Sequence, residues 1–395
     1  MRKLLALTLA AMMIATAFAG CGSSNANSAP ASGESKEAPA APTEAIKLGI
    51  LAPLTGDVAI YGIAASNGIQ LAIEEINAAG GVLGQQLDPI LLDEKGDISE
   101  AVNAYNRLLS EEIVALLGDV TSKPTMAVAE LAAADNMPMI TATGTALPIT
   151  TYGPNVFRTC FTDPFQGKIM ATFAAENLKA KNVAIIYNTS DDYSTGLTAS
   201  FKEQAAAKGI TIVAEEGYGN DDKDFKSQLT KIQDKKPDAL FVPDYYTKVA
   251  LIATQAREVG YEGPLLGADG WDGVLGVLDD ANKSAVNNSY ISNHYSPEST
   301  NEKVVSFVKN YSAKYGETPN SFAALGYDTA YMMAQAITKA GSTDAQAIID
   351  AMKAIEFDGV TGHITFDENN NPIKDVAVLK LMDGVAKFDS TVSGS

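Results

Sequence analysis

The sequence predicts an α/β protein made of two halves, each a parallel sheet covered by helices. The chain has 395 residues, which exceeds the usual size of a single hydrophobic core, so we expect two domains. Strand-like apolar runs alternate with amphipathic helical runs, and this alternation restarts after about residue 163. Regular alternation of this kind is typical of parallel sheets, whose faces are covered by the connecting helices.

In the first half, strand-like and helical runs follow each other in order. The strand-like runs are residues 46–52, 87–92 and 113–118, and a further one that Pro138 opens. The helical runs are residues 66–78, 98–109 and about 124–135. In the first helical run, Ile69, Ile73 and Ile76 recur at the spacing of one helix face. Pro124 favours the start of a helix.

The second half repeats this order. Its strand-like runs are residues 182–187, 210–214, 239–242 and 264–266. Its helical runs are about residues 165–178, 194–208, 225–233 and 246–259. A third block, residues 301–354, predicts three helices. The chain then closes with two strands, 362–366 and 376–382, about a turn at 367–372.

The N-terminus has the features of an export signal. Two basic residues precede an apolar run, residues 4–18, that is too short to span a membrane comfortably. Small residues then precede Cys21, and the pattern FAGC at 18–21 resembles the bacterial lipobox. We expect removal of residues 1–20 and lipidation of Cys21, the alternative being an ordinary cleavage site with a chance cysteine. Residues 22–44 are rich in Ser, Ala, Pro and Gly and predict a flexible tether.

Composition excludes several classes of function. The net charge of −19 argues against nucleic acid and anionic lipid surfaces as partners. Two cysteines and two histidines exclude a thiolate zinc site and disfavour a His-rich metal site. We expect no metal, no cofactor and no disulfide framework.

Enzymatic motifs are also missing from the sequence. There is no GxxxxGK[ST] phosphate loop, no GxGxxG dinucleotide loop and no GxSxG elbow. Cys160 has no base nearby in sequence. His363 lies in a strand pattern and His294 follows residues 291–293 near an expected domain crossing, so we interpret both as structural. The sequence predicts a protein that is not an enzyme.

The most informative loop lies in residues 137–151, MPMITATGTALPITT. A short apolar strand runs directly into small residues with hydroxyls, and Gly144 allows a close backbone approach. Hydroxyls and free N–H groups at a strand end offer donors for a small anion such as a carboxylate. The alternative is a turn whose hydroxyls satisfy only the local backbone.

Other unusual residues also follow strands, where ligands bind in sheets of this class. In the first half they are residues 54–57 and 119–122, and in the second half residues 188–193, 243–246 and 267–271. Thr and Ser dominate one half, whereas Tyr, Asp and Trp dominate the other. The two halves are therefore expected to act as complementary jaws.

Three sequence segments together resemble a known family. They are LTGD at 54–57 with Tyr61, LAIEEINAAGGVLG at 71–84, and FAALGYD at 322–328. With the loops above, they resemble the leucine/isoleucine/valine-binding proteins of ABC importers, over about residues 46–382. The resemblance implies a type I periplasmic-binding-protein clamshell with two doubly wound parallel-sheet lobes and three crossings. The first lobe would be residues 45–161 and 294–372, and the second 162–293 and 373–395 with the tail.

The resemblance also implies a site. A carboxylate would be bound by Ser122, Thr143, Gly144 and Thr145, and an ammonium group by Tyr245 and Asp269. The aromatic residues of the pocket would be Tyr61, Tyr193 and Trp271. Several alternatives stay open: Asp269 and Ser122 as helix caps, Tyr61 and Tyr193 as packing residues, Trp271 as core, and Tyr246 in the place of Tyr245.

The function that the resemblance implies is extracytoplasmic capture of an α-amino acid. A branched-chain or other aliphatic side chain is favoured, and the partners would be the amino acid and the permease subunits of an ABC importer. The protein would be a monomer on the outer face of the cytoplasmic membrane or in the periplasm, anchored through Cys21. The alternative is a sensing or uptake module of the same fold for an amide, a urea or an aromatic acid.

Overall fold

The computed structural model describes residues 44–374 and 376–392. These residues belong to one compact unit of the chain, Thr43–Ser395. The lipidation predicted at Cys21, the signal at 1–20 and nearly all of the tether at 22–44 lie outside the described residues.

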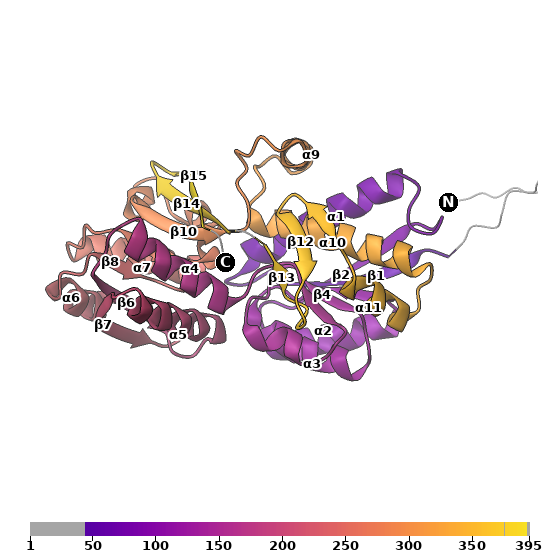
Figure 1. The fold of residues 1–395 in the computed structure, drawn as a ribbon, viewed down its shortest axis with the longest axis horizontal. Coiled ribbons are helices and arrows are strands. Elements are labelled where there is room, and N and C mark those ends of the chain that lie inside the picture. The colour runs from indigo at the N-terminus through magenta and orange to yellow at the C-terminus, as the bar shows by residue number, and fades with distance from the viewer. Residues whose placement is uncertain (1–43, 375, 393–395) are drawn as a thin grey trace, which may run out of the picture. The chain divides into compact units, whose positions relative to one another are not determined.

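The first lobe is built on a parallel five-stranded sheet in the order β2-β1-β3-β4-β5. Its strands are β1 (Ile46–Ala52), β2 (Leu87–Asp93), β3 (Ala115–Leu117), β4 (Met139–Thr141) and β5 (Val156–Arg158). Its helices are α1 (Ala59–Ala78), α2 (Ile98–Ser110), α3 (Ser122–Ala134) and the short η1 (Leu147–Thr151). Strands and helices alternate along the chain, as the sequence predicts (Figure 1).

The second lobe is built on a seven-stranded sheet in the order β15-β14-β10-β9-β8-β6-β7. Strands β6 (Asn182–Asn188), β7 (Thr211–Tyr218), β8 (Ala239–Phe241), β9 (Leu265–Gly267) and β10 (Ser289–Asn293) are parallel. Strands β14 (Val376–Met382) and β15 (Val385–Val392) add an antiparallel edge. The helices are α4 (Asp163–Glu176), α5 (Asp192–Ala207), α6 (Lys226–Asp234), α7 (Tyr246–Glu258), η2 (Asp269–Trp271), α8 (Val274–Val277) and η3 (Lys283–Val286).

The third segment returns to the first lobe. It comprises α9 (Glu302–Tyr315), α10 (Ser321–Ala340), α11 (Ala345–Lys353), and a small sheet of β11 (Phe357–Gly359), β12 (Gly362–Phe366) and β13 (Pro372–Ile373). Helix α10 packs along α1, and α11 packs on α10. The chain therefore crosses between the lobes after β5, after β10 and after β13. The prediction of an α/β fold with two parallel-sheet halves is confirmed.

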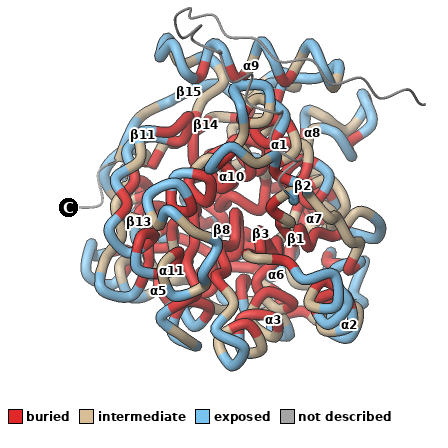
Figure 2. Tube along the Cα trace, turned by 90° about the vertical axis from the view of Figure 1, so that its right-hand side faces the viewer, coloured by how far each residue is buried: buried red, intermediate tan, exposed pale blue. Residues whose placement is uncertain are grey.

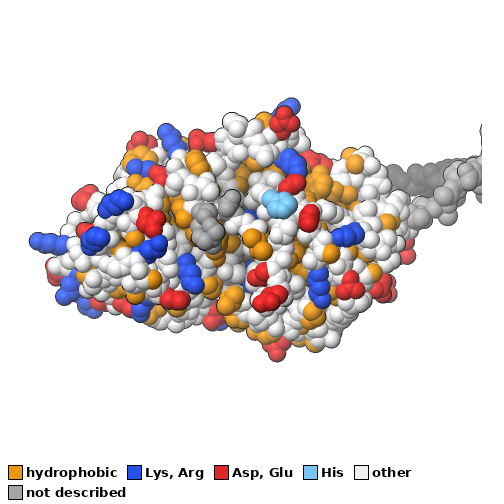
Figure 3. Space-filling model, viewed as in Figure 1, with side chains coloured by type: hydrophobic (Ala, Val, Ile, Leu, Met, Phe, Trp, Pro, Cys, Tyr) orange, Lys and Arg blue, Asp and Glu red, His pale blue; other side chains and the backbone are white. Residues whose placement is uncertain are grey.

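Burial follows the strands and the inner faces of the helices (Figure 2). Strands β3 and β8 are buried at every residue, which explains why they are continuous apolar runs without alternation. On the face shown in Figure 3, acidic and basic side chains are interspersed among uncharged ones. None of the helices in the described residues is long and apolar enough to cross a membrane.

Helix α1 begins at Ala59, seven residues before the predicted start at residue 66. Its first turns bury small residues, because α1 passes very close to its neighbours. A Cβ at Gly62 would lie 2.0 Å from the carbonyl oxygen of Pro53, and one at Gly68 would lie 2.0 Å from that of Ala323. The small residues that allow this close approach do not recur at the apolar spacing of a helix face. The sequence pattern therefore does not predict this part of the helix.

The two closing strands do not form one hairpin. Strand β12 pairs with β11 and β13, whereas β14 pairs with β10 and β15 in the other sheet. The turn at 367–372 connects β12 to β13, and the third crossing follows it. Strands β5, β10, β11 and β13 were not predicted, because two to five residues give little periodicity. Strand β15 has eight residues but none of them is buried, so it lacks the apolar alternation of a half-buried strand.

Candidate ligand-binding site

A small cavity lies between the loops that follow the strands of the two lobes. It is lined by Tyr61, Val120, Thr121, Ser122, Thr143, Thr145, Tyr193, Tyr245, Asp269, Gly270 and Phe322. Only about 10 Å³ is open to the centre of a water molecule, which is room for about one water. Seven of the nine ligand-binding residues expected from the sequence therefore line one cavity. The other two, Gly144 and Trp271, do not line it.

The polar part of the first-lobe wall consists of hydroxyl side chains at the start of α3 and on the loop after β4. Ser122 is the first residue of α3, and its Oγ lies 3.5 Å from Thr145 Oγ1. Thr143 donates its hydroxyl to the carbonyl oxygen of Val120 at 2.8 Å. This wall combines neutral donors with the N-terminus of α3, where free N–H groups and the helix dipole favour a negative charge.

Arg158 holds this wall from behind. It is fully buried and donates to the carbonyl oxygens of Gly144 and Ala146, each at 2.9 Å, and to that of Leu147 at 3.2 Å. Gly144 is itself tightly packed, because a Cβ there would lie 2.9 Å from Ile149 Cδ1. Gly144 thus shapes the loop from below and does not line the cavity.

Two buried carboxyl groups, Glu94 and Asp119, lie under the same wall. Asp119 Oδ1 accepts a hydrogen bond from the N–H of Val120 at 2.6 Å. The backbone carbonyl oxygen of Asp119 accepts the hydroxyl of Thr141, also at 2.6 Å. Glu94 accepts from the N–H of Gly96 at 2.9 Å. Burial raises the pKa of Asp119, and burial together with the charge of Asp119 raises the pKa of Glu94. The pair therefore retains a proton more readily than exposed carboxyls do.

The second-lobe wall centres on the carboxylate of Asp269, which is 2% exposed. Its Oδ1 accepts the hydroxyl of Tyr193 at 2.8 Å, and its Oδ2 lies 3.2 Å from Nε2 of His294. Its backbone N–H donates to Gln166 Oε1 at 3.1 Å. Burial and the charge of Asp269 raise the pKa of Tyr193 well above its usual range, so the Tyr193 hydroxyl keeps its hydrogen and donates it.

Two tyrosines complete this wall. The rings of Tyr193 and Tyr245 stack with centroids 4.8 Å apart and an interplanar angle of 11°. Tyr245 caps α7 and lines the cavity. Tyr246 lies elsewhere, because its hydroxyl accepts the N–H of Ile60 in the first lobe at 3.3 Å. Of the two tyrosines between which the sequence does not decide, Tyr245 is the one at the cavity.

Tyr61 joins the two lobes directly. Its hydroxyl donates to the carbonyl oxygen of Gly270 and accepts from the N–H of Tyr246 at 3.0 Å. Its ring stacks on Phe322 with centroids 4.3 Å apart. Tyr61 comes from the first lobe and both of its hydrogen-bond partners from the second, so these bonds form only when the lobes are together.

Trp271 is packed inside the second lobe. It is fully buried, and its indole N–H donates to the carbonyl oxygen of Val242 at 2.7 Å. The ring lies over Gly267, where a Cβ would be 2.2 Å from Nε1. This placement corresponds to the core alternative rather than to a pocket wall.

Three buried polar residues belong to this arrangement although the sequence analysis assigned them no role in it. They are Arg158, Asp163 and His294. Asp163 opens α4, and its N–H donates to the Thr145 carbonyl at 3.0 Å. Burial raises the pKa of Asp163 well above its usual range. Their position in the sequence could have indicated a role at the site. Each of the three lies within five residues of a predicted crossing, where the lobes meet.

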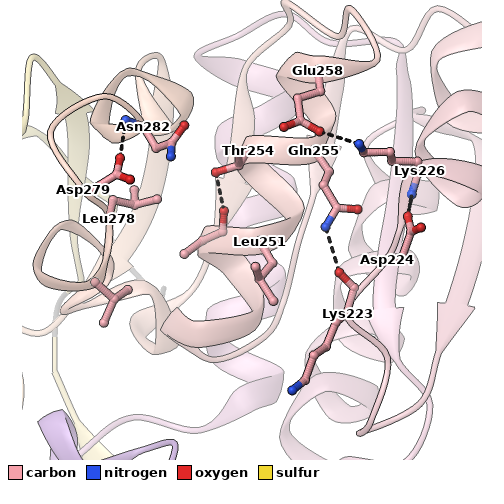
Figure 4. A pocket seen from close by; sticks show the side chains of 12 residues that line it. Lys223, Asp224, Lys226, Leu251, Thr254, Gln255, Glu258, Leu278, Asp279 and Asn282 are labelled. Carbon is pink, nitrogen blue, oxygen red and sulfur yellow. Dashed lines mark hydrogen bonds and ion pairs between the residues drawn. The ribbon is translucent and has the colours of Figure 1, made fainter.

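A larger cavity of about 540 Å³ lies on the second lobe, away from these residues. Figure 4 shows side chains from α7 and the neighbouring segments around it. Several of its charged groups already have partners: Lys226 contacts Glu258 at 2.9 Å, and Asp224 and Asp279 accept from the backbone N–H groups of Lys226 and Asn282. This groove does not set a buried carboxylate opposite hydroxyls and a helix N-terminus, as the small cavity does.

Comparisons with known proteins identify the family of the chain. A family model described as periplasmic binding protein matches residues 45–385. The Leu/Ile/Val-binding protein BraC3 of Rhizobium johnstonii is 33% identical over 331 residues, which is 82% of this chain and 88% of the relative. The leucine-, isoleucine-, valine-, threonine-, and alanine-binding protein of Pseudomonas aeruginosa is 28% identical, over 83% of this chain and 87% of the relative.

Solved structures of binding proteins also align with most of this chain. The leucine binding protein LivK of Thermotoga maritima aligns with a TM-score of 0.82 at 34% identity, over 88% of this chain and 99% of that one. The branched-chain amino acid transporter substrate binding protein LivJ of Streptococcus pneumoniae, in complex with isoleucine, aligns with a TM-score of 0.80 at 33% identity and the same coverage. The predicted type I architecture is confirmed, and so is the prediction that the protein is not an enzyme. The chain belongs to the periplasmic binding protein family, whose members are extracytoplasmic substrate-binding proteins.

Proposed function

We propose that this protein captures an α-amino acid with an aliphatic, branched-chain side chain between its lobes and delivers it to an ABC importer. The observation that carries the proposal is the pairing of two unlike walls on one cavity. Hydroxyls and a helix N-terminus face it from the first lobe, and the Asp269 carboxylate with two tyrosines faces it from the second. The names of the relatives, which bind leucine, isoleucine and valine, support the same class of ligand.

The physical argument starts from the charges of the ligand. An amino acid is a zwitterion, and burying either charge without a partner is expensive. In our proposal, Ser122, Thr143 and Thr145 bind the carboxylate, with Gly144 shaping their loop. Asp269 and Tyr245 bind the ammonium group, and Tyr193 orients Asp269. Each lobe thus satisfies one charge, and only the closed form satisfies both.

Closure then follows as a population shift. The lobes contact each other through Tyr61, Tyr246 and Gly270, and the space between them holds about one water. An amino acid therefore needs the lobes to part before it enters. A ligand that bridges the two walls favours the closed form by its differential affinity for that form, and we propose that the closed form docks on the permease.

The aromatic surface at the cavity supplies the side-chain pocket. Tyr61, Phe322 and Val120 form its apolar part, and we assign Trp271 to the support of this region from the core. Residues 45–161 with 294–372 would move as one lobe, and residues 162–293 with 373–395 as the other. We propose that the protein is a monomer.

We also propose that the mature protein is a lipoprotein. The lipobox pattern that ends at Cys21 supports lipidation after loss of residues 1–20, and the tether at 22–44 would link the lipid to the lobes. The Cys21→Ser variant is expected to leave the membrane fraction and appear in the soluble extracytoplasmic fraction. Retention of that variant in the membrane fraction would refute the lipid anchor.

Calorimetric titration with leucine, isoleucine and valine tests the proposal directly. We expect about one amino acid per chain, with a smaller radius of gyration by X-ray scattering when ligand is present. Short amides, urea and benzoate are the comparison ligands. Binding of one of these with no response to any α-amino acid would replace amino-acid capture by the sensing or uptake alternative.

A further inference from the structure

His294 is the second side chain that contacts the Asp269 carboxylate. Its Nε2 lies 3.2 Å from Asp269 Oδ2, while the hydroxyl of Tyr193 lies 2.8 Å from Oδ1. Each carboxylate oxygen therefore has its own side-chain partner. With the backbone N–H of Asp269 bound by Gln166, the carboxylate is fixed before any ligand arrives.

The imidazole ring is itself held in place. His294 is 3% exposed, and its ring stacks on Phe161 with centroids 3.7 Å apart and an interplanar angle of 18°. Phe161 follows β5 at the first crossing, and His294 follows β10 at the second. The ring is carried by the second crossing and packs on the first, which restricts the direction of its Nε2.

The chemistry of the pair defines which nitrogen carries hydrogen. An ionised carboxylate only accepts hydrogen bonds, so Nε2 of His294 must donate. Nδ1 is buried and has no hydrogen-bond partner in the described residues, a place that suits a bare nitrogen better than an N–H group. Burial lowers the pKa of His294 to about 4. The ring therefore donates a hydrogen bond without adding a positive charge.

We propose that His294 is a positioning residue for the ligand's ammonium group: as a neutral donor it holds the Asp269 carboxylate in the orientation that faces the ligand. This inference rests on the proposed function, in which Asp269 is the ammonium partner. Without a donor at Oδ2, the carboxylate is held only through Oδ1, and the charge that attracts the ligand is no longer fixed in place. A cationic residue in the same place would supply a donor and cancel that charge.

Two amide variants separate this role from simple packing. In His294→Gln, the side-chain amide nitrogen reaches about as far as Nε2 of histidine. In His294→Asn, the amide ends one bond earlier, near the position of Nδ1. The measurement is the ratio of two dissociation constants, for 4-methylpentanoate (leucine without its ammonium group) and for leucine. His363→Asn is the matched control, because His363 contacts Asp358 on the surface, with both side chains exposed.

We expect His294→Gln and His363→Asn to keep the wild-type ratio within about three-fold. His294→Asn should lower the ratio by about ten- to a hundred-fold, with little change for 4-methylpentanoate. If His294→Asn weakens both ligands equally, or if His294→Gln loses the ratio as Asn does, the residue acts only through packing and the inference is wrong. A wild-type protein that binds no α-amino acid overturns the proposed function first, and the inference with it.

A second measurement locates the imidazole hydrogen of His294 in the wild-type protein itself. The chain contains two histidines, so nitrogen-15 imidazole spectra of the wild-type protein contain few signals, and His363→Asn identifies its own. We expect His294 to be neutral at about pH 7, with hydrogen on Nε2, both with and without leucine. A ring that is protonated, or that carries its hydrogen on Nδ1, contradicts the proposed role.

Discussion

The two walls of the cavity solve the problem of holding a ligand charge in different ways. The first-lobe wall has no charged side chain at the cavity surface, and its hydroxyls are held by loops that Arg158 fixes from behind. The second-lobe wall presents a charged side chain, Asp269, and fixes it by side chains rather than by its loop. A carboxylate can be bound by neutral donors on a rigid backbone, whereas an ammonium group needs an acceptor that is itself oriented and ionised.

This difference predicts that affinity is concentrated in one residue of the second wall and spread over the first. Changes to the second wall should alter ligand affinity with little change in stability. Changes behind the first wall should lower stability together with affinity. The following variants test that contrast.

Asp269→Asn should have the largest effect on affinity. Truncating one partner of a buried charge pair costs about 2–5 kcal/mol, which is about thirty-fold to several-thousand-fold in the dissociation constant of leucine. Asn keeps the size of the side chain, so the melting temperature without ligand should stay close to wild type. Calorimetry that finds leucine affinity within about three-fold of wild type, under ~0.7 kcal/mol, would remove Asp269 from the site.

Arg158→Met should be next, and it should act on stability as well. The variant leaves buried carbonyls of the 144–147 loop without donors, and we expect a loss of about 2–4 kcal/mol in the free energy of unfolding. Arg257→Met is the matched control, because Arg257 also donates to several backbone carbonyls, those of Tyr261, Gly263, Ala285 and Asn287. Urea unfolding should show both losses, but only Arg158→Met should weaken leucine binding. Equal leucine affinities in the two variants would show that the 144–147 loop does not contribute to leucine binding.

Tyr61→Phe should have a smaller effect. It removes the hydroxyl that bonds Gly270 and Tyr246 across the lobes and keeps the ring stacked on Phe322. The closed form should lose about 0.5–1.5 kcal/mol, which weakens leucine binding by about two- to ten-fold. Scattering of the ligand-free variant should show a larger mean radius of gyration. An unchanged radius and affinity would mean that Tyr61 packs without biasing closure.

Glu94→Gln should have the smallest effect on affinity and a distinctive effect on stability. The folded protein raises the pKa of Glu94 through burial and through the charge of Asp119. A raised pKa contributes stability that is complete at low pH and is lost as the pH rises through the folded value. Glu94→Gln mimics the protonated form, so at about pH 9 it should melt above the wild type, with little difference at about pH 5. If the wild type were more stable than Glu94→Gln at about pH 9, the result would contradict the retention of a proton by Glu94.

Local pattern was enough to predict most strands of the two large sheets and most helices, and it marked several residues of the proposed site. Ser122, Thr143 and Asp269 each follow a buried strand, where the geometry of a parallel sheet collects functional residues. The roles of Arg158 and His294 could not be found in this way, because they depend on contacts that only the fold sets. Arg158 meets the carbonyl groups of the 144–147 loop, and His294 meets Asp269 and Phe161. Trp271 shows the opposite limit: its position two residues after Asp269 suggests the pocket, yet its ring turns into the core.

The early start of α1 and the separation of β12 from β14 have a related cause. The first turns of α1 follow the close approach of neighbouring backbones, and the partner of β14 is β10, more than eighty residues earlier. Neither feature is encoded in a local period. In a chain that crosses three times between lobes, many strands and helices pair with segments far away in sequence. Patterns within a short stretch of sequence do not show such pairings.

The most direct test of the account compares leucine with its two singly charged analogues on the wild-type protein by calorimetry. 4-Methylpentanoate keeps the carboxylate and lacks the ammonium group, whereas 3-methylbutylamine keeps the ammonium group and lacks the carboxylate. If each wall holds one charge, each analogue should bind at least about thirty-fold more weakly than leucine, a loss of about 2 kcal/mol or more. Either analogue binding as tightly as leucine would show that one wall does not recognise a charge and would contradict the account.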